Sequence, residues 1–513
     1  MFKKLLVANR GTIAIRIIRA CRELDIATLA IYSTADKDAL HVRMADEAVC
    51  IGPAAAEDSY LNIPAIISTA LTYGADAVHP GYGFLSENGD FAEACRRSGV
   101  HFVGPLARHI RLMGDKPRAR RIMQRAGVPV LPGSEGKGVT EVREALADAK
   151  RLGFPVLIKA AAGGGGKGMR VARDEKELSR LFALARAESE AAFGSRTMYL
   201  EKYLEHARHV EFQILADTYR NVIHMGERDC SIQRRHQKVL EEAPCPVMTA
   251  RLRDKMGKAA VRAAQVVGYS NVGTVEFLLS ADGSFYFIEM NTRIQVEHAI
   301  TEMVTGVDLV KAQIEVAAGA PLPFSQKDLS QHGWALECRI YAEDPAAGFV
   351  PAPGRIDTLR WPSGPGVRND AGVYAGAEVP VFYDPMISKL VVWGRDRTEA
   401  IARMRRALGE FVIAGELTTN LDFHRWLMHH PVFLGGDYDT NFIEHEYHPR
   451  AIAADAKSGG RDDGEFTAAM LAVAAAAQKM GNGRAADTAG AGRQAARGGS
   501  AWKTLGRLDV LRR

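Results

Sequence analysis

The chain has 513 residues, of which 47% are hydrophobic and 25% are charged. This composition is typical of a folded protein with more than one core and excludes a disordered or membrane-embedded chain. The formal net charge of +5 is small for this length, so charge alone does not favour a nucleic-acid partner.

The location of the protein follows from its cysteines and its apolar segments. The six cysteines show neither zinc-ligand nor disulfide spacing. The N-terminal apolar stretch is interrupted by Asn9 and Arg10 before a secretory signal can form. The longest nearly uncharged stretch, 466–478, is shorter than the roughly 20 apolar residues that span a bilayer. We therefore expect a cytoplasmic protein with no membrane partner.

Residues 1–115 predict a doubly wound α/β domain. Lys4–Ala8 and Ala27–Tyr32 have strand character on either side of a helix that ends near Leu24, and such a β-α-β unit predicts a parallel sheet. The first turn contains only Gly11, whereas a dinucleotide fingerprint needs three glycines, so we favour a scaffold over an NAD site. The run His79–Gly83 follows a predicted strand, where it is as compatible with a structural loop as with a ligand loop.

Three further regions follow along the chain. Residues 116–325 have the short strands, hairpins and helices of an α+β domain. Residues 326–449 predict a third, mixed α/β domain with Gly and Pro turns. Residues 450–513 are rich in Ala, Gly and Arg and cannot build a core, so we expect a partly helical or flexible tail. The expected fold class combines α/β and α+β.

A glycine-rich loop joins two predicted strands of the second region. The strand Pro155–Ala160 leads into Gly163–Gly168, where the absence of Cβ atoms lets backbone N–H groups approach an anion closely. A Walker A loop is rejected, because Ala161 and Gly168 occupy its first Gly and its Ser/Thr position and no helix follows. We predict a flap over ATP phosphates and consider a plain surface hairpin the weaker alternative.

Basic residues outside the loop have two interpretations. Lys159 and Lys116 are expected to add positive charge to the phosphate site. The segment 226–238 also concentrates cationic and amide groups. Charge runs are usually solvated, and this segment lacks the interleaved aromatic residues of a single-strand binder. The segment by itself therefore does not decide between an anion site and a solvated surface.

A predicted hairpin brings two carboxylates together. The strand-like runs 273–280 and 284–289 flank Asp282-Gly283, the signal of a two-residue type I′ turn. With this turn, Glu276 lies directly opposite Glu289. Like charges in such a position require a cation, and hard oxygen ligands suit Mg²⁺ or Mn²⁺.

The same face of the hairpin continues beyond Glu289 if the strand stays extended. Alternate positions then add an amide, a cation, a second amide and a carboxylate: Asn291, Arg293, Gln295 and Glu297. Two glutamates splayed into solvent are common, but six polar positions on one face favour a site. Because magnesium commonly bridges carboxylates to phosphates, we predict one ATP–metal site between the hairpin and the glycine loop.

Over about residues 1–447 the chain resembles the biotin carboxylase family of the ATP-grasp superfamily, in particular the biotin carboxylase subunit of acetyl-CoA or acyl-CoA carboxylase complexes. The motifs that carry the resemblance occur in order: Ala8–Gly11, His79–Asn88, Arg111–Lys116, the glycine loop, Glu201–Leu204, Glu227–Pro244 and Phe285–His298. The resemblance implies a ligase in which ATP converts bicarbonate to carboxyphosphate, whose CO₂ is attacked by N1′ of biotin.

The resemblance also implies site residues in the second region. An ATP site would include Lys116, Lys159, Gly163, Gly164, Gly165, Gly166, Lys167, Gly168, Glu201, Lys202, Leu204, His209, Gln233 and His236. The metal, expected as two Mg²⁺ or Mn²⁺ ions, would be held by Glu276, Glu289 and Asn291.

For bicarbonate and biotin, the resemblance implies four catalytic residues: Lys238, Arg293, Glu297 and Arg339. Bicarbonate would lie against Lys238, Arg293, Gln295 and the Val296 backbone, with Glu297 as the general base. Biotin would contact Tyr82 and Arg339, and Arg339 would stabilise the biotin enolate. Without the resemblance, Arg339 would be interpreted as an ordinary ion-pair partner in a strand.

The sequence departs from the family pattern in two places. Ala161 and Ala162 occupy positions where many relatives have Ser or Gly, and Lys167 one where many have Arg, which leaves the flap cationic. Near the C-terminus, 478–480 is the closest approach to the biotin acceptor Ala-Met-Lys-Met, and it lacks the preceding Met. We therefore expect a homodimer that works with biotin on a separate biotin carboxyl carrier protein and with a separate carboxyltransferase subunit. No nucleic-acid partner is expected.

Two alternatives stay open at this point. Another ATP-grasp ligase, of the carbamoyl-phosphate type, would act on ammonia or an amine, and Glu297 together with Arg339 has no evident purpose in it. A nucleotide-binding scaffold would have a damaged catalytic row, whereas Lys238 and Arg293 are present. The sequence does not identify the final carboxyl acceptor.

Overall fold

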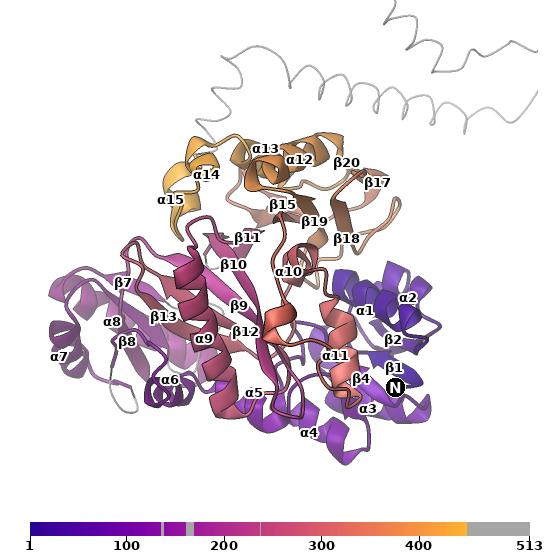
Figure 1. The fold of residues 1–513 in the computed structure, drawn as a ribbon, viewed down its shortest axis with the longest axis horizontal. Helices are drawn as coiled ribbons and strands as arrows, with labels where there is room; N and C mark the ends of the chain where they lie inside the picture. Colours follow the sequence, from indigo (N-terminus) through magenta and orange to yellow (C-terminus); the bar gives the residue numbers. More distant parts are fainter. Residues whose placement is uncertain (135–137, 161–168, 236, 449–513) are drawn as a thin grey trace, which may run out of the picture. The chain divides into compact units, whose positions relative to one another are not determined.

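The structure is a computed structural model that describes residues 1–134, 138–160, 169–235 and 237–448. Met1–Tyr447 belong to one unit, whose elements are described below (Figure 1). Within the described ranges, no helix combines the length and the apolar character that crossing a membrane requires. The predicted tail at 450–513 lies outside the described residues.

A five-stranded parallel sheet with the order β3-β2-β1-β4-β5 forms the N-terminal part. Its strands are β1 (Lys4–Val7), β2 (Ala27–Ser33), β3 (Glu47–Gly52), β4 (Ala77–His79) and β5 (His101–Phe102). Its helices are α1 (Gly11–Glu23), α2 (Leu40–Met44), α3 (Ile63–Thr72), α4 (Gly89–Arg97) and α5 (Ala107–Gly114). The chain winds outward from β1 in both directions, so the predicted doubly wound α/β fold is confirmed.

The side chains of β1 explain this arrangement. Leu5 and Val7 pack in one cluster with Ile17 of α1, whereas Leu6, between them, packs with Ile66 of α3. Successive side chains of a strand point to opposite faces, so both faces of the sheet are covered by helices. A continuous apolar run, rather than an alternating one, is what such a doubly covered strand needs.

A smaller antiparallel sheet, with the order β7-β6-β8, carries the glycine loop. Its strands are β6 (Val156–Ala160), β7 (Arg170–Ala172) and β8 (Met198–Lys202), and the helices that pack on it are α7 (Val142–Leu152) and α8 (Glu175–Phe193). Helix α6 (Lys116–Arg125) packs instead against β13 (Phe285–Asn291). The prediction that the loop joins two strands is confirmed. The loop itself, 161–168, lies outside the described residues.

An eight-stranded antiparallel sheet dominates the rest of the unit, with the order β13-β12-β9-β10-β11-β14-β19-β18. Its strands are β9 (Arg208–Ala216), β10 (Val222–Arg234), β11 (Gln237–Ala243), β12 (Asn271–Leu279), β13 (Phe285–Asn291), β14 (Trp334–Tyr341), β18 (Val367–Ala371) and β19 (Met386–Gly394). Because β11 pairs with β14, the sheet continues across residues 325 and 326, where a domain boundary was expected.

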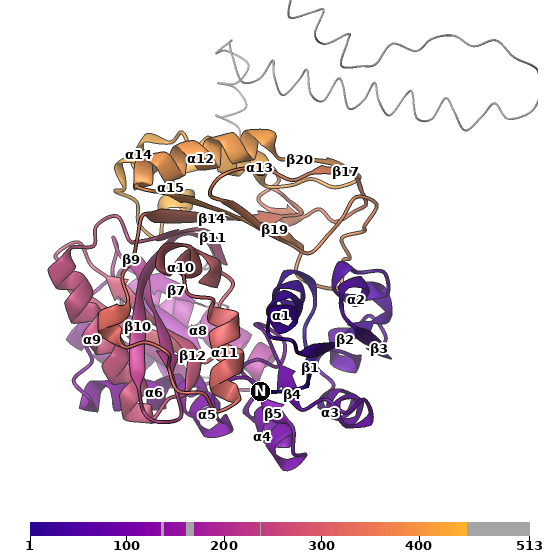
Figure 2. The ribbon, with the colours of Figure 1, turned by 45° about the vertical axis from the view of Figure 1, so that its right-hand side comes forward.

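The two faces of this sheet differ in character. Leu336 and Cys338 of β14 belong to the apolar core that includes Met404 of α12 (Arg397–Glu410). Their neighbours Glu337 and Arg339 point to the other face, which α10 (His298–Thr305) covers. Figure 2 shows α12 on one side of β14 and β19 and α10 on the other. The α10 face is therefore the charged one.

The β12–β13 hairpin corrects the predicted turn. The N–H of Ser280 donates to the carbonyl of Ser284 at 2.8 Å, and Gly283 has a φ of 81°, so three residues form the turn instead of the predicted two. By itself this change would move Glu276 away from Glu289. A register shift next to Phe277 adds one residue to β13 and restores the pairing of Glu276 with Glu289. The predicted pairing is thus confirmed, although the predicted turn is wrong.

The extended strand expected beyond Glu289 ends early. Strand β13 runs to Asn291, and the chain then bends before α10 begins at His298. Arg293, Gln295 and Glu297 therefore do not continue one strand face. They approach the same place because the bend turns the chain back toward the sheet.

Two further helices, α9 (Ala250–Val267) and α11 (Leu309–Ala317), pack against β9, β10 and β12. The C-terminal part also contains β15 (Glu343–Asp344), β16 (Val350–Pro351), β17 (Ile356–Arg360), β20 (Val412–Gly415), α13 (Leu421–Leu427), α14 (Pro431–Gly435) and α15 (Phe442–Glu446). Buried Asn420, just before α13, donates to the carbonyl of Arg339 and accepts from the N–H of Tyr341, each at 2.9 Å. This contact fixes the backbone of β14 beside Arg339.

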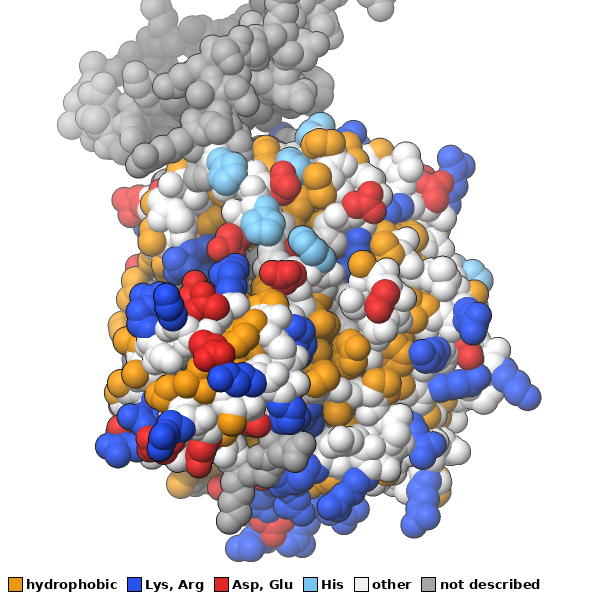
Figure 3. Space-filling view, turned by 90° about the vertical axis from the view of Figure 1, so that its left-hand side faces the viewer, with side chains coloured by type: hydrophobic (Ala, Val, Ile, Leu, Met, Phe, Trp, Pro, Cys, Tyr) orange, Lys and Arg blue, Asp and Glu red, His pale blue; other side chains and the backbone are white. Residues whose placement is uncertain are grey.

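The exposed surface mixes charges of both signs. On the face shown in Figure 3, basic and acidic side chains are interspersed with hydrophobic ones, and histidines gather in its upper half. This distribution agrees with the small net charge of +5. The unusual charges of this protein lie inside, on the α10 face of the large sheet.

Candidate active site

The ammonium group of Lys238 lies at the centre of a cluster of carboxylates. Its Nζ lies 2.6 Å from Glu211, 3.1 Å from Glu276 and 2.7 Å from Glu297. The three carboxylates are almost completely buried. Buried like charges are tolerated only when cations and hydrogen bonds compensate them, so this arrangement identifies a site rather than ordinary packing.

Register pairing across the sheet explains how the carboxylates meet. Glu289, Glu276 and Glu211 face one another across β13, β12 and β9, and Arg228 of β10 faces Glu211. Four charged side chains therefore form one row across four adjacent strands. The prediction from the sequence covered only the first pair of this row.

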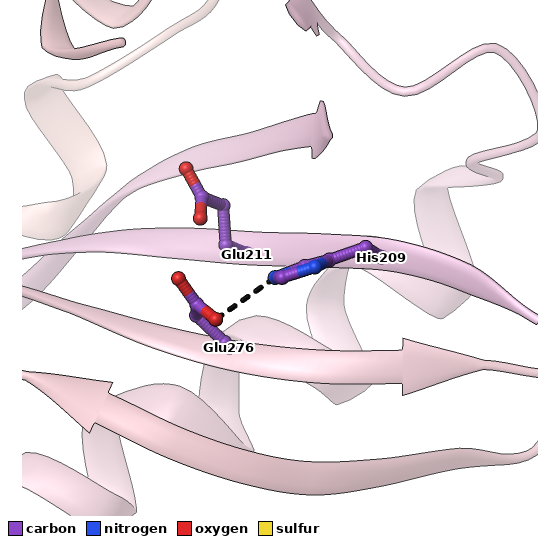
Figure 4. A group of neighbouring side chains, drawn as sticks. All are labelled: His209, Glu211 and Glu276. Carbon is purple, nitrogen blue, oxygen red and sulfur yellow. Dashed lines mark ion pairs between the residues drawn. The ribbon is translucent and has the colours of Figure 1, made fainter. Parts of the chain in front are cut away.

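Glu276 has polar contacts with three further side chains besides Lys238. The amides of Asn291 and Gln295 each donate to it at 2.8 Å, and His209 lies 2.9 Å away. Figure 4 shows His209 and Glu211 on β9 and Glu276 on the neighbouring strand β12. Although burial opposes ionisation, Lys238 and His209 hold the pKa of Glu276 well below its usual range. Glu276 is therefore an ionised carboxylate.

Arg228 is a central residue that the sequence did not identify. Its guanidinium is completely buried and donates five hydrogen bonds of 2.6–3.2 Å. The acceptors lie on β9, β12, the bend before α10 and α10 itself: Glu211, Gln213, Thr274, Gln295 and Thr301. Arg228 belongs to the basic segment 226–238. The alternative that this segment is a solvated surface is wrong at this position, because Arg228 is buried.

A second acidic group surrounds Arg339. The guanidinium of Arg339 lies 2.9 Å from Glu297 and donates to Glu241 of β11 at 2.6 Å. Glu241 faces Glu337 on β14. Burial raises the pKa of Glu241 to about 7 and that of Glu337 to about 8. Neither oxygen of Glu337 has a hydrogen-bond partner among the described residues, so Glu337 is the carboxyl group that most readily keeps its proton.

Two lysines predicted to hold phosphates form ion pairs with predicted site carboxylates. Lys116 lies 2.8 Å from Glu289, and Lys159 pairs with Glu201. Arg120 approaches Glu201 to 3.5 Å. These cations thus join carboxylates of the hairpin and of the small sheet, between which the predicted ATP–metal site would lie.

The other predicted residues have more varied positions. Arg293 contacts Glu87 at 3.0 Å and donates to Asn291 at 3.0 Å. Gln233 is buried opposite Lys238 in the β10–β11 register, and the hydroxyl of Tyr82 contacts Thr12 at 2.8 Å. Lys202 of β8 instead donates to the carbonyls of Gly153 and Phe154, at 3.0 and 2.9 Å, and Leu204 follows the same strand. Gly163–Gly168, with Lys167, and His236 lie outside the described residues.

The donor set fits a divalent metal. Glu276, Glu289 and Asn291 offer oxygen atoms, which Mg²⁺ and Mn²⁺ prefer. Both glutamates already contact cations, because Lys238 approaches Glu276 and Lys116 approaches Glu289. Within the described part of the chain, His209, Glu211 and Glu276 also offer ligand atoms within 4.8 Å of one another, a grouping not predicted from the sequence.

These contacts suit the handling of a small oxyanion. Lys238 and Arg339 form a pair of cations on either side of the Glu297 carboxylate. Although burial opposes its ionisation, Lys238 and Arg339 keep the pKa of Glu297 below its usual value. An ionised carboxylate between two cations can accept a proton from an anion that the same cations hold.

Three models of known protein families match consecutive parts of the chain. Residues 1–110 match the biotin carboxylase N-terminal domain, 115–325 the ATP-binding domain of the carbamoyl-phosphate synthase L chain, and 337–445 the biotin carboxylase C-terminal domain. Together the matches cover most of the chain.

Curated relatives and solved structures agree with the family matches. Biotin carboxylase of a Nostoc species is 58% identical over 443 residues, which cover 86% of this chain and 99% of that protein. Biotin carboxylase 1 of Bacillus subtilis is 56% identical over 445 residues, which cover 86% of this chain and 98% of that protein. The biotin carboxylase domain dimer of Hydrogenobacter thermophilus 2-oxoglutarate carboxylase, solved with MgADP, ADP and bicarbonate, has a TM-score of 0.84 at 49% identity, covering 88% of this chain and 98% of its own.

The Arg228 network predicts a large loss of stability on truncation. Arg228→Met should lower the free energy of unfolding by about 3–5 kcal/mol. It removes one of the two cations that contact buried Glu211 and leaves four further acceptors without their donor. Denaturant unfolding followed by fluorescence measures this loss. Arg19→Met, at an exposed position of α1, is the matched control and should change stability by less than about 0.5 kcal/mol. Equal effects of the two substitutions would contradict the role given to Arg228.

Glu337 predicts a specific pH dependence of stability. Its folded-state pKa, raised by burial to about 8, lies above that of an unfolded glutamate, so its contribution is complete in acid and is lost as the pH rises toward and through 8. Glu337→Gln removes this loss. The difference in Tm between variant and wild type should therefore become more positive by ~2 °C or more from pH 5.5 to pH 8.5. A difference that is constant with pH, measured by thermal denaturation, would show that Glu337 does not retain a proton.

Proposed function

We propose that this chain, which belongs to the biotin carboxylase family, catalyses the ATP-dependent carboxylation of biotin by bicarbonate. It is an ATP-dependent ligase, as its curated relatives are. One observation carries the assignment of the site: the buried carboxylate of Glu297 lies between Lys238 and Arg339, next to the Glu276–Glu289 pair. In this proposal the arrangement combines a base, an anion clamp and oxygen donors for a metal.

In this proposal, Glu297 removes the proton of bicarbonate. As the resemblance implies, Lys238, Arg293, Gln295 and the Val296 backbone hold the bicarbonate. The geometry adds Arg339, which contacts the second oxygen of the Glu297 carboxylate. When the anion takes up part of the charge of the two cations, less of it stabilises the Glu297 carboxylate, and the pKa of Glu297 rises. Glu297 thereby becomes a stronger base only when its substrate is bound.

The phosphates of ATP would replace the carboxylates that now contact two lysines. Lys116 and Lys159 contact Glu289 and Glu201, and both ion pairs lie partly open to solvent. A triphosphate that binds here would take over the lysines and leave Glu289 to join Glu276 and Asn291 as metal ligands. A bound Mg²⁺ or Mn²⁺ would neutralise phosphate charge during transfer. Glu201, Lys202 and Leu204, with His209, Gln233 and His236, are proposed for the nucleotide.

Biotin is proposed to bind next to Arg339. The guanidinium of Arg339 is fixed by Glu241 and Glu297, so its position does not depend on biotin. Burial raises the pKa of Tyr82, and Glu337 and Arg339 contribute to its electrostatic surroundings, which supports placing Tyr82 and Arg339 near the same ligand. We propose that biotin arrives on a separate carrier protein, that a separate carboxyltransferase uses the carboxybiotin, and that the chain acts as a homodimer in the cytoplasm.

Three domains are proposed for the described unit, at 1–115, 116–325 and 326–449. The family matches at 1–110, 115–325 and 337–445 support this division. The large sheet crosses the second boundary, so these domains share hydrogen bonds between β11 and β14. The second and third domains are therefore expected to unfold together.

The proposed function predicts ATP hydrolysis that requires bicarbonate and is stimulated by free biotin. Glu297→Gln should lower this rate by roughly 10²–10⁴-fold, because the amide cannot accept the proton. Release of phosphate with and without bicarbonate measures the effect, and retained ATP binding is the control for folding. Hydrolysis that depends on ammonia rather than bicarbonate would favour the carbamoyl-phosphate alternative and sink the proposal.

The proposed metal ligands predict a change in metal dependence. Glu276→Gln should raise the Mg²⁺ concentration needed for half-maximal turnover by about 10–100-fold, because an amide is a weaker ligand than a carboxylate. Folding should change much less, since Lys238 keeps Glu211 and Glu297. Metal titrations of turnover, with exposed Glu57→Gln as the matched control, provide the measurement. Unchanged metal dependence would refute the ligand role of Glu276.

A further inference from the structure

Lys389 is a buried cation to which neither the sequence nor the proposed reaction assigns a role. It lies on β19 with only 1% of its side chain exposed. Its Nζ donates to the carbonyl oxygen of Val296 at 2.7 Å and lies 3.6 Å from Asp370. Burying an ammonium group costs several kcal/mol unless close contacts compensate it. The contacts of Lys389 therefore indicate what it does.

Neutralising Asp370 does not explain Lys389. Asp370 already forms two hydrogen bonds with Arg368, at 3.0 and 2.9 Å. The shorter contact of Lys389 is with a neutral backbone carbonyl. Its closest interaction thus holds the bend between β13 and α10, which carries the proposed bicarbonate residues.

The carbonyl that Lys389 holds belongs to the peptide that joins Val296 to Glu297. Glu297 precedes α10 as its N-cap residue, but its side chain forms no capping hydrogen bond. That side chain instead contacts Lys238 and Arg339. Lys389 therefore supplies a side-chain anchor for the backbone on the N-terminal side of Glu297.

Strand pairing brings Lys389 next to the other cation that contacts Glu297. Arg339 of β14 and Lys389 of β19 are register partners, so they lie side by side on the α10 face. Arg339 holds the carboxylate of Glu297 while Lys389 holds its peptide. Two adjacent strands thereby fix both ends of the same residue.

Other charged and titratable groups also face Lys389: Glu337 of β14, on whose pKa Lys389 acts electrostatically, His298 of α10 and Asp370 of β18. Glu337, from β14, has its pKa raised to about 8 by burial, and it lacks a hydrogen-bond partner within the described residues. His298, from α10, has its pKa held well below its usual value by burial and by Lys389. Asp370, from β18, is shared with Arg368. The Val296 carbonyl remains the closest polar partner of Lys389.

We propose that Lys389 is a positioning residue for the general base: it fixes the Val296–Glu297 peptide so that the Glu297 carboxylate lies between Lys238 and Arg339. This inference rests on the proposed function. It assigns to Lys389 no contact with substrate, and it predicts an effect on turnover rather than on nucleotide binding.

The test compares Lys389→Met with Lys389→Gln in the full chain, using bicarbonate-dependent ATP hydrolysis with free biotin. Lys389→Met removes the donor, and the resulting displacement of Glu297 should lower kcat about 100-fold. The KM for ATP should change less than about twofold, because the nucleotide contacts lie elsewhere. The amide of Lys389→Gln can still donate to the carbonyl and should recover about tenfold of the lost kcat.

Ser388→Ala is the matched control, because Ser388 is the adjacent buried residue on β19 and points to the opposite face. It should keep wild-type kcat. A kcat for Lys389→Met within about threefold of wild type overturns the inference. A loss of ATP-induced thermal stabilisation in parallel with the loss of kcat also overturns it, because it indicates a merely structural role. If the wild-type chain lacks the bicarbonate-dependent reaction, the proposed function fails instead.

Lys389→Arg keeps the test decisive if the neutral variants do not fold. It retains the charge beside Asp370, but its bulkier guanidinium should displace the Val296 peptide. We expect a kcat at least fivefold lower than wild type with an unchanged KM for ATP. A fall in kcat that is matched by an equal loss of ATP-induced thermal stabilisation in this variant overturns the inference.

Discussion

The ammonium group of Lys238, shared by three buried carboxylates, is the interaction on which the rest of the site depends. Glu211 comes from β9, Glu276 from β12 and Glu297 from the bend before α10, and Lys238 from β11 contacts all three. Each carboxylate is unfavourable in the interior without a cation. The cluster therefore ties four separate segments to one point, and the substrate groups must be arranged around it.

The large sheet makes this cluster possible because one of its faces is apolar and the other is charged. On the α12 side, residues such as Leu336 and Met404 form an ordinary apolar core. On the α10 side, the same strands present Glu337, Arg339 and Lys389. One face thus packs the apolar core with α12, while the other holds charges at fixed spacing. A site built on strands is also more rigid than one built on loops.

Part of this arrangement could be predicted from the sequence, and the hairpin shows why. Its alternating pattern and its turn signal predicted that Glu276 faces Glu289, which the register confirms. The prediction succeeded although the turn has three residues, because a bulge beside Phe277 compensates. A single sequence does not reliably show whether a hairpin turn has two or three residues, or where a strand contains a bulge. Residues that lacked a local pattern, such as Arg228 and Glu241, were missed.

The sequence by itself determined the order of the elements, the parallel N-terminal sheet, the carboxylate pair of the hairpin and, through the resemblance, the family. Each of these depends on residues close together in the chain or on motifs in a fixed order. Only the tertiary structure decided that Glu211 lies beside Lys238 and that Lys389 holds the Val296 carbonyl, 93 residues away in the chain. The physical reason is that sheet order and the bend after Asn291 result from packing of the whole unit, and no local periodicity records them.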